Sequence, residues 1–356
     1  MSDQSSSGFT YQRAGVDNTS GARAKARIGE MVRGTYTPDV IGDFGHFGGM
    51  FRSPGNPSSI LVSSADSVGT KVLLAVLAGE HRGIGVDLVN HSVNDILCCG
   101  ARPLFFLDYF ATSGLDEAVL ADIMEGMTSA CVDAGCALVG GETAQLPGIY
   151  QESTYDLAGF MVGTVEEANM IDGSSIAEGQ LIVGFASNGL HTNGYSLARA
   201  VLGLSDEDVD SSRSRLADIP ETIGESLGDA LLRPHPSYLH QIVPYLDTGM
   251  VHGLAHITGG GIAGNLERII PDDCTAVIQI GAWPELPLFK LIQQRGDVAS
   301  TEMYDVFNMG VGFILVADAD LARQIADDDR QAHIIGEIRS ATSPDERVAL
   351  HGMSAS

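Results

Sequence analysis

Val139-Gly140-Gly141-Glu142-Thr143-Ala144-Gln145-Leu146-Pro147-Gly148 is the stretch on which the interpretation of this chain depends. It continues a short apolar run that we expect to be a strand. Paired glycines let backbone N–H groups approach an anion closely, because no Cβ stands in the way. A carboxylate there would repel a phosphate unless a cation such as Mg²⁺, which prefers oxygen ligands, lay between them. The stretch therefore predicts a loop for Mg²⁺-bridged nucleotide phosphates, although most Gly-Gly pairs are simply turns.

The composition limits the class of protein. A chain of 356 residues suits two domains, and 44% apolar residues with 43 glycines fit a globular α/β protein. A net charge of −26 disfavours binding to nucleic acid or to anionic membranes. Five cysteines without a C-x-x-C pair disfavour structural zinc and a disulfide framework. Because the sequence has neither a secretory signal nor an apolar run of about 20 residues, we expect a cytoplasmic protein.

Strand and helix patterns alternate along the chain and break once, near Asp172. We therefore predict a loop-rich segment over 1–59, with a glycine-rich lid at 41–51, a first domain over 60–172 and a second over 173–350. Strands are expected at 60–65, 104–112, 137–139, 155–165, 180–186, 254–257, 275–280, 311–317 and 333–338. Helices are expected at 72–78, 85–99, 116–134, 194–203, 225–232, 236–246, 261–270, 286–295 and 319–328.

A second candidate phosphate site lies where the strand at 60–65 meets the following helix. A helix N-terminus favours an anion through its free N–H groups and its dipole. Here Gly69 permits close approach, Thr70 offers a hydroxyl and Lys71 a positive charge, while Asp66 would again need a cation. The order is not that of a Walker A loop. Taken alone, an ordinary helix cap by Asp66 explains the motif equally well.

The helix at 85–99 carries Asp87, His91, Asn94 and Asp95 on the face opposite its apolar residues. For Asp87, Asn94 and Asp95 the alternatives are a solvated polar face or ligands to a metal or a hydroxyl group. Asparagine and aspartate are poor helix formers, which modestly favours ligands.

Two segments of the second half add further polar groups. The loop at 187–196 contains His191 and Asn193 among glycines, and His191 either has a structural role or contacts a phosphate or shuttles a proton. Thr258 precedes Gly259, Gly260 and Gly261, which open a helix and form an anion nest. No nucleophile or zinc-helix motif occurs, so the sequence favours phosphoryl transfer, in which positioning and electrostatics carry catalysis.

In this order the segments resemble the phosphoribosylformylglycinamidine cyclo-ligase (AIR synthetase) family, from Tyr11 to about Val348. The matching pieces are SADSVGTK, VNDILCCGARPLFFLDYFATSGL, LVGGETAQLPGIY, SNGLHTNGYSL, LAHITGGGI and FNMGVGF. The resemblance implies a two-domain α/β fold whose N-terminal mixed sheet pairs with that of a second subunit into a barrel. It also implies ATP-dependent conversion of formylglycinamidine ribonucleotide (FGAM) to aminoimidazole ribonucleotide (AIR), with Mg²⁺; a requirement for K⁺ is left open.

The resemblance also implies roles for the residues singled out above. ATP is expected to contact Asp66, Gly69, Thr70, Lys71, Asp95, Gly140, Gly141 and Glu142. Metal ligands are expected to be Asp66, Asp95 and Glu142. The transferring phosphate or the substrate's ribose phosphate is expected to contact His191, Asn193, Thr258, Gly259, Gly260 and Gly261. Catalytic contributions are expected from His191, Asp66 and Lys71.

This chain departs from the family pattern at three places: Gly29 replaces a lysine, Pro234-His235-Pro236 replaces Pro-Thr-Arg, and Gln145 replaces a second acid. Each departure puts one predicted anion or metal contact in doubt. Selenophosphate synthetase, thiamine-monophosphate kinase and a non-catalytic nucleotide-binding paralogue remain alternatives. The first usually carries an early reactive cysteine or selenocysteine, yet no cysteine precedes Cys98. The second should lack the His-x-Asn-Gly-Tyr-Ser run.

Overall fold

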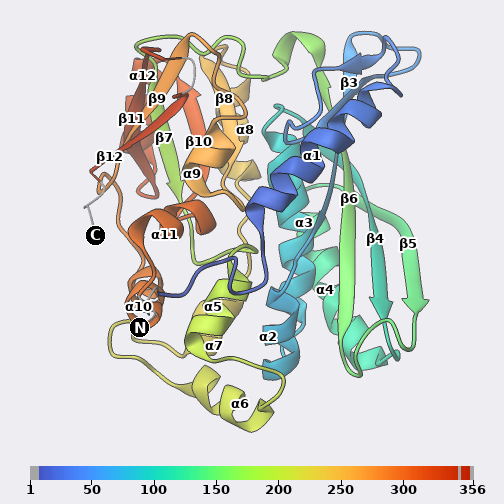
Figure 1. Ribbon diagram of the computed structural model, residues 1–356. Helices are drawn as coiled ribbons and strands as arrows, with labels where there is room; N and C mark the ends of the chain where they lie inside the picture. Colours follow the sequence, from blue (N-terminus) through green and yellow to red (C-terminus); the bar gives the residue numbers. More distant parts are fainter. Residues whose placement is uncertain (1–7, 344–345, 353–356) are drawn as a thin grey trace.

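The computed structural model describes residues 8–343 and 346–352, which form two sheets that lie side by side with helices between and around them (Figure 1). The described part of the chain contains no helix that is both long and apolar enough to cross a membrane. The two-domain α/β fold predicted from the sequence is confirmed, because each half of the chain builds its own sheet.

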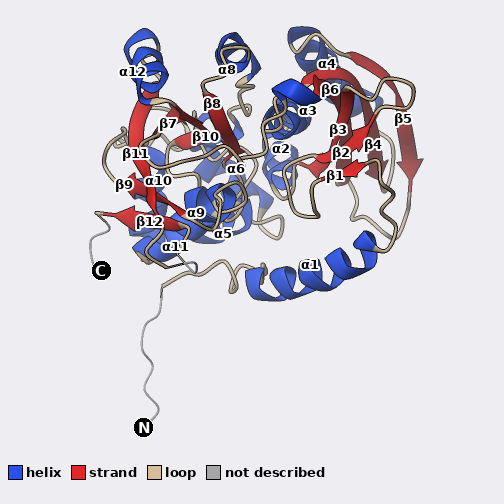
Figure 2. Ribbon diagram, turned by 90° about the horizontal axis from the view of Figure 1, so that it is seen from above, coloured by secondary structure: helices blue, strands red, loops and turns tan. Residues whose placement is uncertain are grey.

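The first sheet is mixed and has the order β1-β2-β3-β6-β4-β5. Only its β4–β5 pair is parallel. Helices α3 and α4 pack on one face of this sheet, and α1 lies away from that face (Figure 2). The elements are α1 (Asn18–Arg33), β1 (Val40–Ile41), β2 (Gly49–Arg52), β3 (Ser59–Ser67), α2 (Lys71–Ala78), α3 (Arg82–Leu97), β4 (Arg102–Thr112), α4 (Glu117–Asp133), β5 (Ala137–Gln145) and β6 (Tyr155–Glu166).

The second sheet has the order β12-β9-β11-β7-β10-β8, and only β12–β9 is parallel. Strand β10 is buried along its whole length, so it is the centre of this domain's core. The elements are β7 (Leu181–Ala186), α5 (Tyr195–Leu202), α6 (Val209–Ala217), α7 (Leu227–Leu232), α8 (Leu239–Leu246), β8 (Val251–His256), α9 (Gly261–Leu266), β9 (Cys274–Gln279), α10 (Pro287–Gly296), α11 (Ser300–Val306), β10 (Val311–Ala317), α12 (Ala319–Asp328), β11 (Ala332–Ser340) and β12 (Val348–His351).

The segment 1–59 is more regular than its composition indicates. Its helix α1 was not predicted; among its described residues, the large apolar side chains of Ile28 and Met31 are exposed and form no core-facing stripe. Strands β1 and β2 pair with each other at the two ends of the glycine-rich stretch, and β2 also pairs with β3. The lid predicted over 41–51 therefore reduces to the connection 42–48, and its motion stays a prediction.

Gly140, Gly141 and Glu142 lie inside β5, so the loop predicted after a three-residue strand is wrong. Gly141 pairs with Asp108 of β4, and a Cβ at Gly141 would come within 2.2 Å of the Asp108 Oδ1 atom. The glycine is needed here for the close approach of a neighbouring side chain. The strand continues because a parallel partner, which no local pattern reveals, supplies its hydrogen bonds.

The substitution Gly141→Ala should destabilise the protein by about 1–3 kcal/mol, because the new methyl group forces Asp108 out of place. Gly140→Ala is the matched control, since nothing lies within 4 Å of a Cβ at that position. Urea unfolding of both variants measures the difference. Equal stabilities would show that the close approach at Gly141 has no energetic weight.

Helix α3 is buried on both faces, although the sequence predicts one apolar and one polar face. Its apolar face packs on the first sheet, and its polar face meets the second domain. Asn94 accepts the Tyr238 backbone N–H at 2.9 Å and donates to the Pro236 carbonyl at 2.9 Å. Asn90 donates to the His235 carbonyl at 2.7 Å. The polar face of α3 therefore fixes the segment 235–238 beside the first domain.

Candidate functional site

A cavity of about 740 Å³ lies between the two domains. Its walls come from the 43–49 stretch, from β3, from α3 and from the region around α9. Four predicted site residues line it, namely Asp66, Asp95, Thr258 and Gly259. Lining residues that the sequence analysis assigned no role are His46, Ser64, His91, Asn265 and Arg268. The cavity is thus built from both domains and includes half-buried and buried charged groups.

Asp66 and His91 form an ion pair in this cavity, with 3.3 Å between Asp66 Oδ1 and His91 Nε2. Burial disfavours the charged imidazole, but Asp66 and the neighbouring carboxylates together outweigh burial and raise the pKa of His91 to about 9. Burial likewise opposes the charge of Asp66, yet charged His91 holds the pKa of Asp66 below its usual value. The Ser64 hydroxyl lies 2.7 Å from Asp66 and 3.1 Å from Asp95, so it links the two carboxylates.

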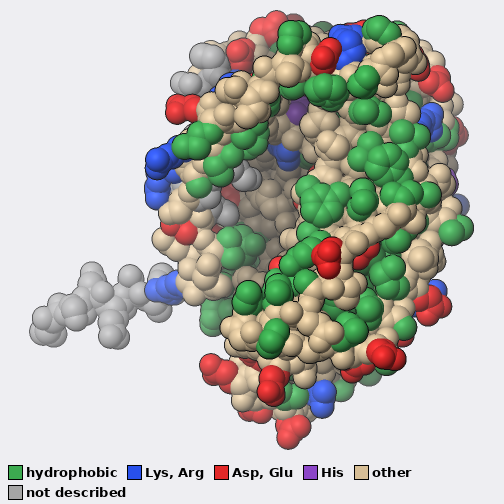
Figure 3. All heavy atoms as spheres, turned by 90° about the vertical axis from the view of Figure 1, so that its right-hand side faces the viewer, with side chains coloured by type: hydrophobic (Ala, Val, Ile, Leu, Met, Phe, Trp, Pro, Cys, Tyr) green, Lys and Arg blue, Asp and Glu red, His purple; other side chains and the backbone are tan. Residues whose placement is uncertain are grey.

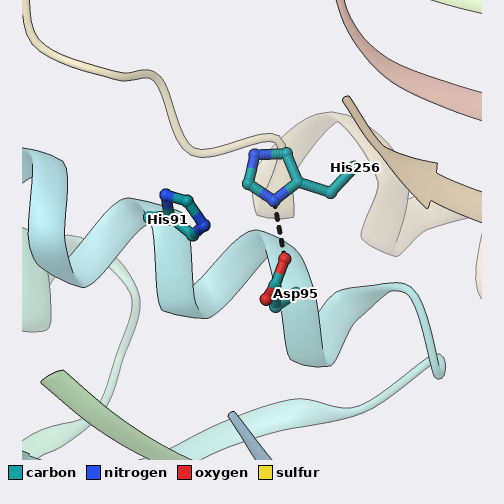
Figure 4. Close-up of side chains that lie close together, drawn as sticks. All are labelled: His91, Asp95 and His256. Atoms are coloured by element: carbon teal, nitrogen blue, oxygen red, sulfur yellow. Dashed lines mark hydrogen bonds and ion pairs between the residues drawn. The ribbon is translucent and has the colours of Figure 1, made fainter. Parts of the chain in front are cut away.

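A buried chain of hydrogen bonds continues from Asp95 into the second domain. Asp95 Oδ1 lies 2.7 Å from His256 Nδ1 (Figure 4). The opposite nitrogen of His256, Nε2, lies 3.0 Å from His235 Nε2. Burial and the nearby Asp66 carboxylate raise the pKa of Asp95 well above its usual value. These contacts join α3, the end of β8 and the segment before α8 at one point.

His191 lies deeper than the cavity wall. It is fully buried, its ring stacks on that of His235 at 4.1 Å, and neither of its ring nitrogens has a partner among the described residues. Its φ of 62° places it in the left-handed region. The phosphate or proton-transfer role predicted for His191 stays a prediction, because the side chain does not line the cavity.

Burial lowers the pKa values of His191, His235 and His256 well below 6.5. Such groups are neutral in the folded state and become charged more readily in the unfolded chain. Their contribution to stability is therefore complete above the unfolded pKa of 6.5 and is lost as the pH falls below it, at up to about 1.4 kcal/mol per pH unit for each group.

We expect the free energy of unfolding to fall less steeply between pH 7 and 5.5 in the variant His191→Phe than in the wild type. Phenylalanine keeps an apolar ring in place and cannot be protonated. Urea unfolding in chelator-containing buffer at several pH values measures the slope, and the exposed His351→Gln variant is the control. An unchanged slope in His191→Phe would contradict a neutral His191.

Lys71 lies in a buried ion pair with Asp87 at 2.7 Å, and its ammonium group also donates to the Arg233 carbonyl at 2.9 Å. Neither Lys71 nor Asp87 has exposed side-chain surface. The contact with ATP phosphates predicted for Lys71 stays a prediction, and the observed contacts indicate a structural role for this lysine.

The remaining predicted residues fall into two groups. Gly260 and Gly261 follow Thr258 and Gly259 at the start of α9, with φ of 96° and 62°. Asn193 adjoins this loop, since a Cβ at Gly259 would lie 3.2 Å from its side-chain oxygen. Gly140, Gly141 and Glu142 do not line the cavity of this single chain, and neither do Gly69 and Thr70.

Sequence reasoning assigned no role to His91, His235 and His256. His91 was noticed on the polar face of its helix, where its spacing of four residues from Asp95 was the available signal. No local signal pointed to His235 or His256, because they meet Asp95 only through contacts between the domains.

Comparisons with known proteins place the chain in a family. The N-terminal domain of AIR synthase related proteins matches residues 49–165, and the C-terminal domain matches 177–348. A Geobacter sulfurreducens protein named phosphoribosylformylglycinamidine cyclo-ligase is 45% identical over 96% of this chain and 99% of its own. A Myxococcus xanthus protein of the same name is 47% identical over 90% of this chain and 92% of its own.

Solved structures show the same fold at low sequence identity. Thiamine-monophosphate kinase from Stenotrophomonas maltophilia superposes with a TM-score of 0.57 at 17% identity, over 91% of this chain and 95% of its own. Hydrogenase maturation protein HypE in complex with ATP gives 0.57 at 21% identity, over 82% and 81%. Because both domain matches and close relatives extend over nearly the whole length, the chain belongs to the phosphoribosylformylglycinamidine cyclo-ligase family of AIR synthase related proteins.

Proposed function

We propose that this protein is the ATP-dependent cyclo-ligase of purine biosynthesis that converts FGAM to AIR, ADP and phosphate. The observation that carries the proposal is the interdomain cavity, which Asp66, Asp95, Thr258 and Gly259 line together, in a chain of this family. Carboxylates and glycine-rich helix starts are the groups that position a nucleotide with its cation and a phosphorylated substrate.

The chemistry explains why such a site suffices. An amide oxygen is a poor leaving group, and transfer of the ATP γ-phosphate to the formamide oxygen makes an imidate from which phosphate can leave. The substrate's own nitrogen then closes the five-membered ring, and holding the substrate in a bent conformation favours this intramolecular attack. Asp66 and Asp95 would hold Mg²⁺, which neutralises charge on the transferring phosphate. The N–H groups around Gly259 and the Arg268 side chain would hold the substrate's own phosphate.

The test is an assay that supplies FGAM, ATP and Mg²⁺ and measures ADP together with the aminoimidazole product. ADP release that depends on FGAM supports the proposal. ADP release without FGAM, or with thiamine monophosphate in its place, would move the assignment to another enzyme of the same fold. The absence of any ADP under all these conditions would favour a non-catalytic paralogue. Adding and omitting K⁺ in the same assay decides whether this ion is required.

We also propose that the protein is a homodimer that pairs through the face of the first sheet opposite α3 and α4. Along each strand, residues on this face alternate with residues on the buried face. If water covered this face, its residues should be polar. It instead presents Phe51, Leu61, Phe105, Leu107 and Phe160, of which Phe160 is 42% exposed. Figure 3 shows apolar side chains gathered on this side of the molecule around a hollow. An apolar sheet face of this kind typically meets a protein partner.

A second copy is the partner that this face fits best. The face contains no lysine or arginine from β3, β4, β5 or β6 except Arg102 at its end, so it has no charge pattern for an anionic ligand. Glu142 of β5 pairs with Tyr109 beside this face. Dimerisation there would bring Glu142 against the other subunit, where the predicted nucleotide contacts of Gly140 and Glu142 would be made.

The substitution Phe160→Glu should convert the dimer to a monomer, because it places a charge at the centre of the apolar face. Light scattering after gel filtration measures the mass of each variant. Ile219→Glu is the control, since Ile219 is 67% exposed but belongs to the second domain. A monomeric wild-type protein at micromolar concentration would refute the proposed dimer.

A further inference from the structure

Two imidazoles and two carboxylates lie together at the interdomain cavity: Asp66, His91 and Asp95 line it, and His256 contacts Asp95. Ligand atoms of His91, Asp95 and His256 all lie within 4.8 Å of one another (Figure 4). Asp66 adjoins them, with 3.3 Å between its Oδ1 atom and His91 Nε2. Among the described residues, these are the only three or more His, Cys, Asp or Glu side chains whose ligand atoms meet at this spacing. All three side chains are buried, so the surrounding protein restricts their motion and keeps them close together.

Rigid elements of both domains hold these side chains. His91 and Asp95 lie four residues apart on α3, which places them on the same side of the helix. His256 is the last residue of β8, whose neighbour β10 is fully buried. Asp66 lies near the end of β3. The donors are therefore set by the core of each domain rather than by mobile loops.

The remote nitrogen of each imidazole is already held by a second group. His91 Nδ1 lies 2.8 Å from the Thr192 hydroxyl, and His256 Nε2 lies 3.0 Å from His235 Nε2. Histidines that bind metals almost always make such a hydrogen bond with their other nitrogen, which fixes the tautomer and the ring. The nitrogens that face the carboxylates are then His91 Nε2 and His256 Nδ1.

We propose that His91, Asp95 and His256 form a binding site for a transition-metal ion of the Zn²⁺ class, with Asp66, which contacts His91, moving in as the fourth ligand. Two imidazole nitrogens with two carboxylates suit Zn²⁺, whereas Mg²⁺ prefers an all-oxygen set. The ion would take the place of the protons now shared by these side chains and release them to solvent. The site shares Asp66 and Asp95 with the Mg²⁺ of the proposed function, and in that respect it rests on that function. Bound Zn²⁺ would therefore exclude Mg²⁺–ATP and inhibit the ligase.

The test uses the full chain, stripped of metal by a chelator, and Zn²⁺ alone without nucleotide. Competition with a chromophoric chelator should show one tightly bound equivalent. Co²⁺ in place of Zn²⁺ should give the intense visible absorption of a four-coordinate site. His91→Gln and His256→Gln should each weaken Zn²⁺ binding by at least about ten-fold. Stoichiometric binding that neither variant changes would overturn the proposal, as would the absence of binding.

His252→Gln is the matched control. His252 belongs to the same strand β8 and also contacts a carboxylate, with 2.9 Å between its Nε2 atom and Asp318. It has no third ligand from α3, so its loss should leave Zn²⁺ affinity unchanged. If His252→Gln weakened Zn²⁺ binding as much as His256→Gln, the binding would come from His–Asp pairs in general. That result would overturn the proposed site.

His235→Asn separates a metal site from a structural cluster. This substitution removes the group that orients His256 but leaves every proposed metal ligand unchanged. Loss of such a partner typically weakens metal binding about 10- to 100-fold. Circular dichroism and urea unfolding of the metal-free variants show whether each one folds. Because binding is measured without nucleotide or turnover, its failure leaves the ligase proposal standing. A ligase assay that fails while Zn²⁺ still binds would leave the metal site standing.

Discussion

Replacing Asp66 with asparagine is expected to lower FGAM-dependent ADP release by at least about ten-fold. The substitution removes the carboxylate that keeps His91 charged and that would hold Mg²⁺ beside the transferring phosphate. Asparagine keeps the shape of the side chain and still accepts a hydrogen bond from Ser64, so the cavity should stay intact. Steady-state rates at saturating ATP, FGAM and Mg²⁺ measure the effect.

Asp95→Asn should lower turnover about as much as Asp66→Asn does. It should lower the free energy of unfolding less than Asp66→Asn does. Burial and the neighbouring Asp66 carboxylate raise the pKa of Asp95, so without a cation this group is neutral and asparagine imitates it. A bound Mg²⁺ would favour ionised Asp95, and asparagine cannot supply that negative charge. The control is Asp327→Asn, an exposed position on α12 outside the cavity. Wild-type rates for both cavity variants at saturating Mg²⁺ would remove Asp66 and Asp95 from the metal site.

The ease of prediction differed among the site residues for a physical reason. Asp66 was found from the sequence because it stands at a junction of strand and helix, which is a local feature. The contacts of His256 and His235 with the first domain join residues more than 100 positions apart, such as Asp95 and His256. No periodicity or turn signal encodes such a meeting. The fold class was predictable because strand and helix patterns alternate along both halves of the chain.

The prediction that Gly140 and Gly141 lie in a loop failed in the opposite way. Their composition is typical of a phosphate loop, but the parallel partner β4 supplies the hydrogen bonds that make them part of a strand. The steric need at Gly141 comes from Asp108, more than 30 residues earlier in the chain. A glycine is demanded equally by a turn, by a bound anion and by a neighbouring side chain, and sequence alone does not separate these causes.

Breaking the buried pair of Lys71 and Asp87 should produce the largest loss of stability. We expect Asp87→Ala to lower the free energy of unfolding by about 3–5 kcal/mol, because it leaves the Lys71 amine buried without its partner. Burial lowers the pKa of Lys71 and raises the pKa of Asp87, and each charge opposes the shift of the other. Urea unfolding at pH 7 measures the loss.

The double substitution Lys71→Met with Asp87→Leu should recover part of that stability, since apolar side chains of similar size often replace a buried ion pair without cost, whereas the His235 N–H and the Arg233 carbonyl each lose a partner. The control is the ion pair between Arg82 of α3 and Glu125 of α4. Both of its side chains are more than half exposed, so Glu125→Ala should cost less than about 1 kcal/mol. If Asp87→Ala cost no more than this surface pair, the buried pair would contribute little to folding.

The double variant also separates stability from activity. Asp87 accepts the His235 backbone N–H at 2.7 Å, and Lys71 donates to the Arg233 carbonyl, so the ion pair ties the segment 233–235 to α2 and α3. Apolar replacements restore packing but cannot restore these two hydrogen bonds. We therefore expect the double variant to fold normally yet lose ligase activity, because His235 and the chain from His256 to Asp95 would no longer be held in register. Full activity in a stable double variant would show that the segment is positioned by Asn90 and Asn94 alone.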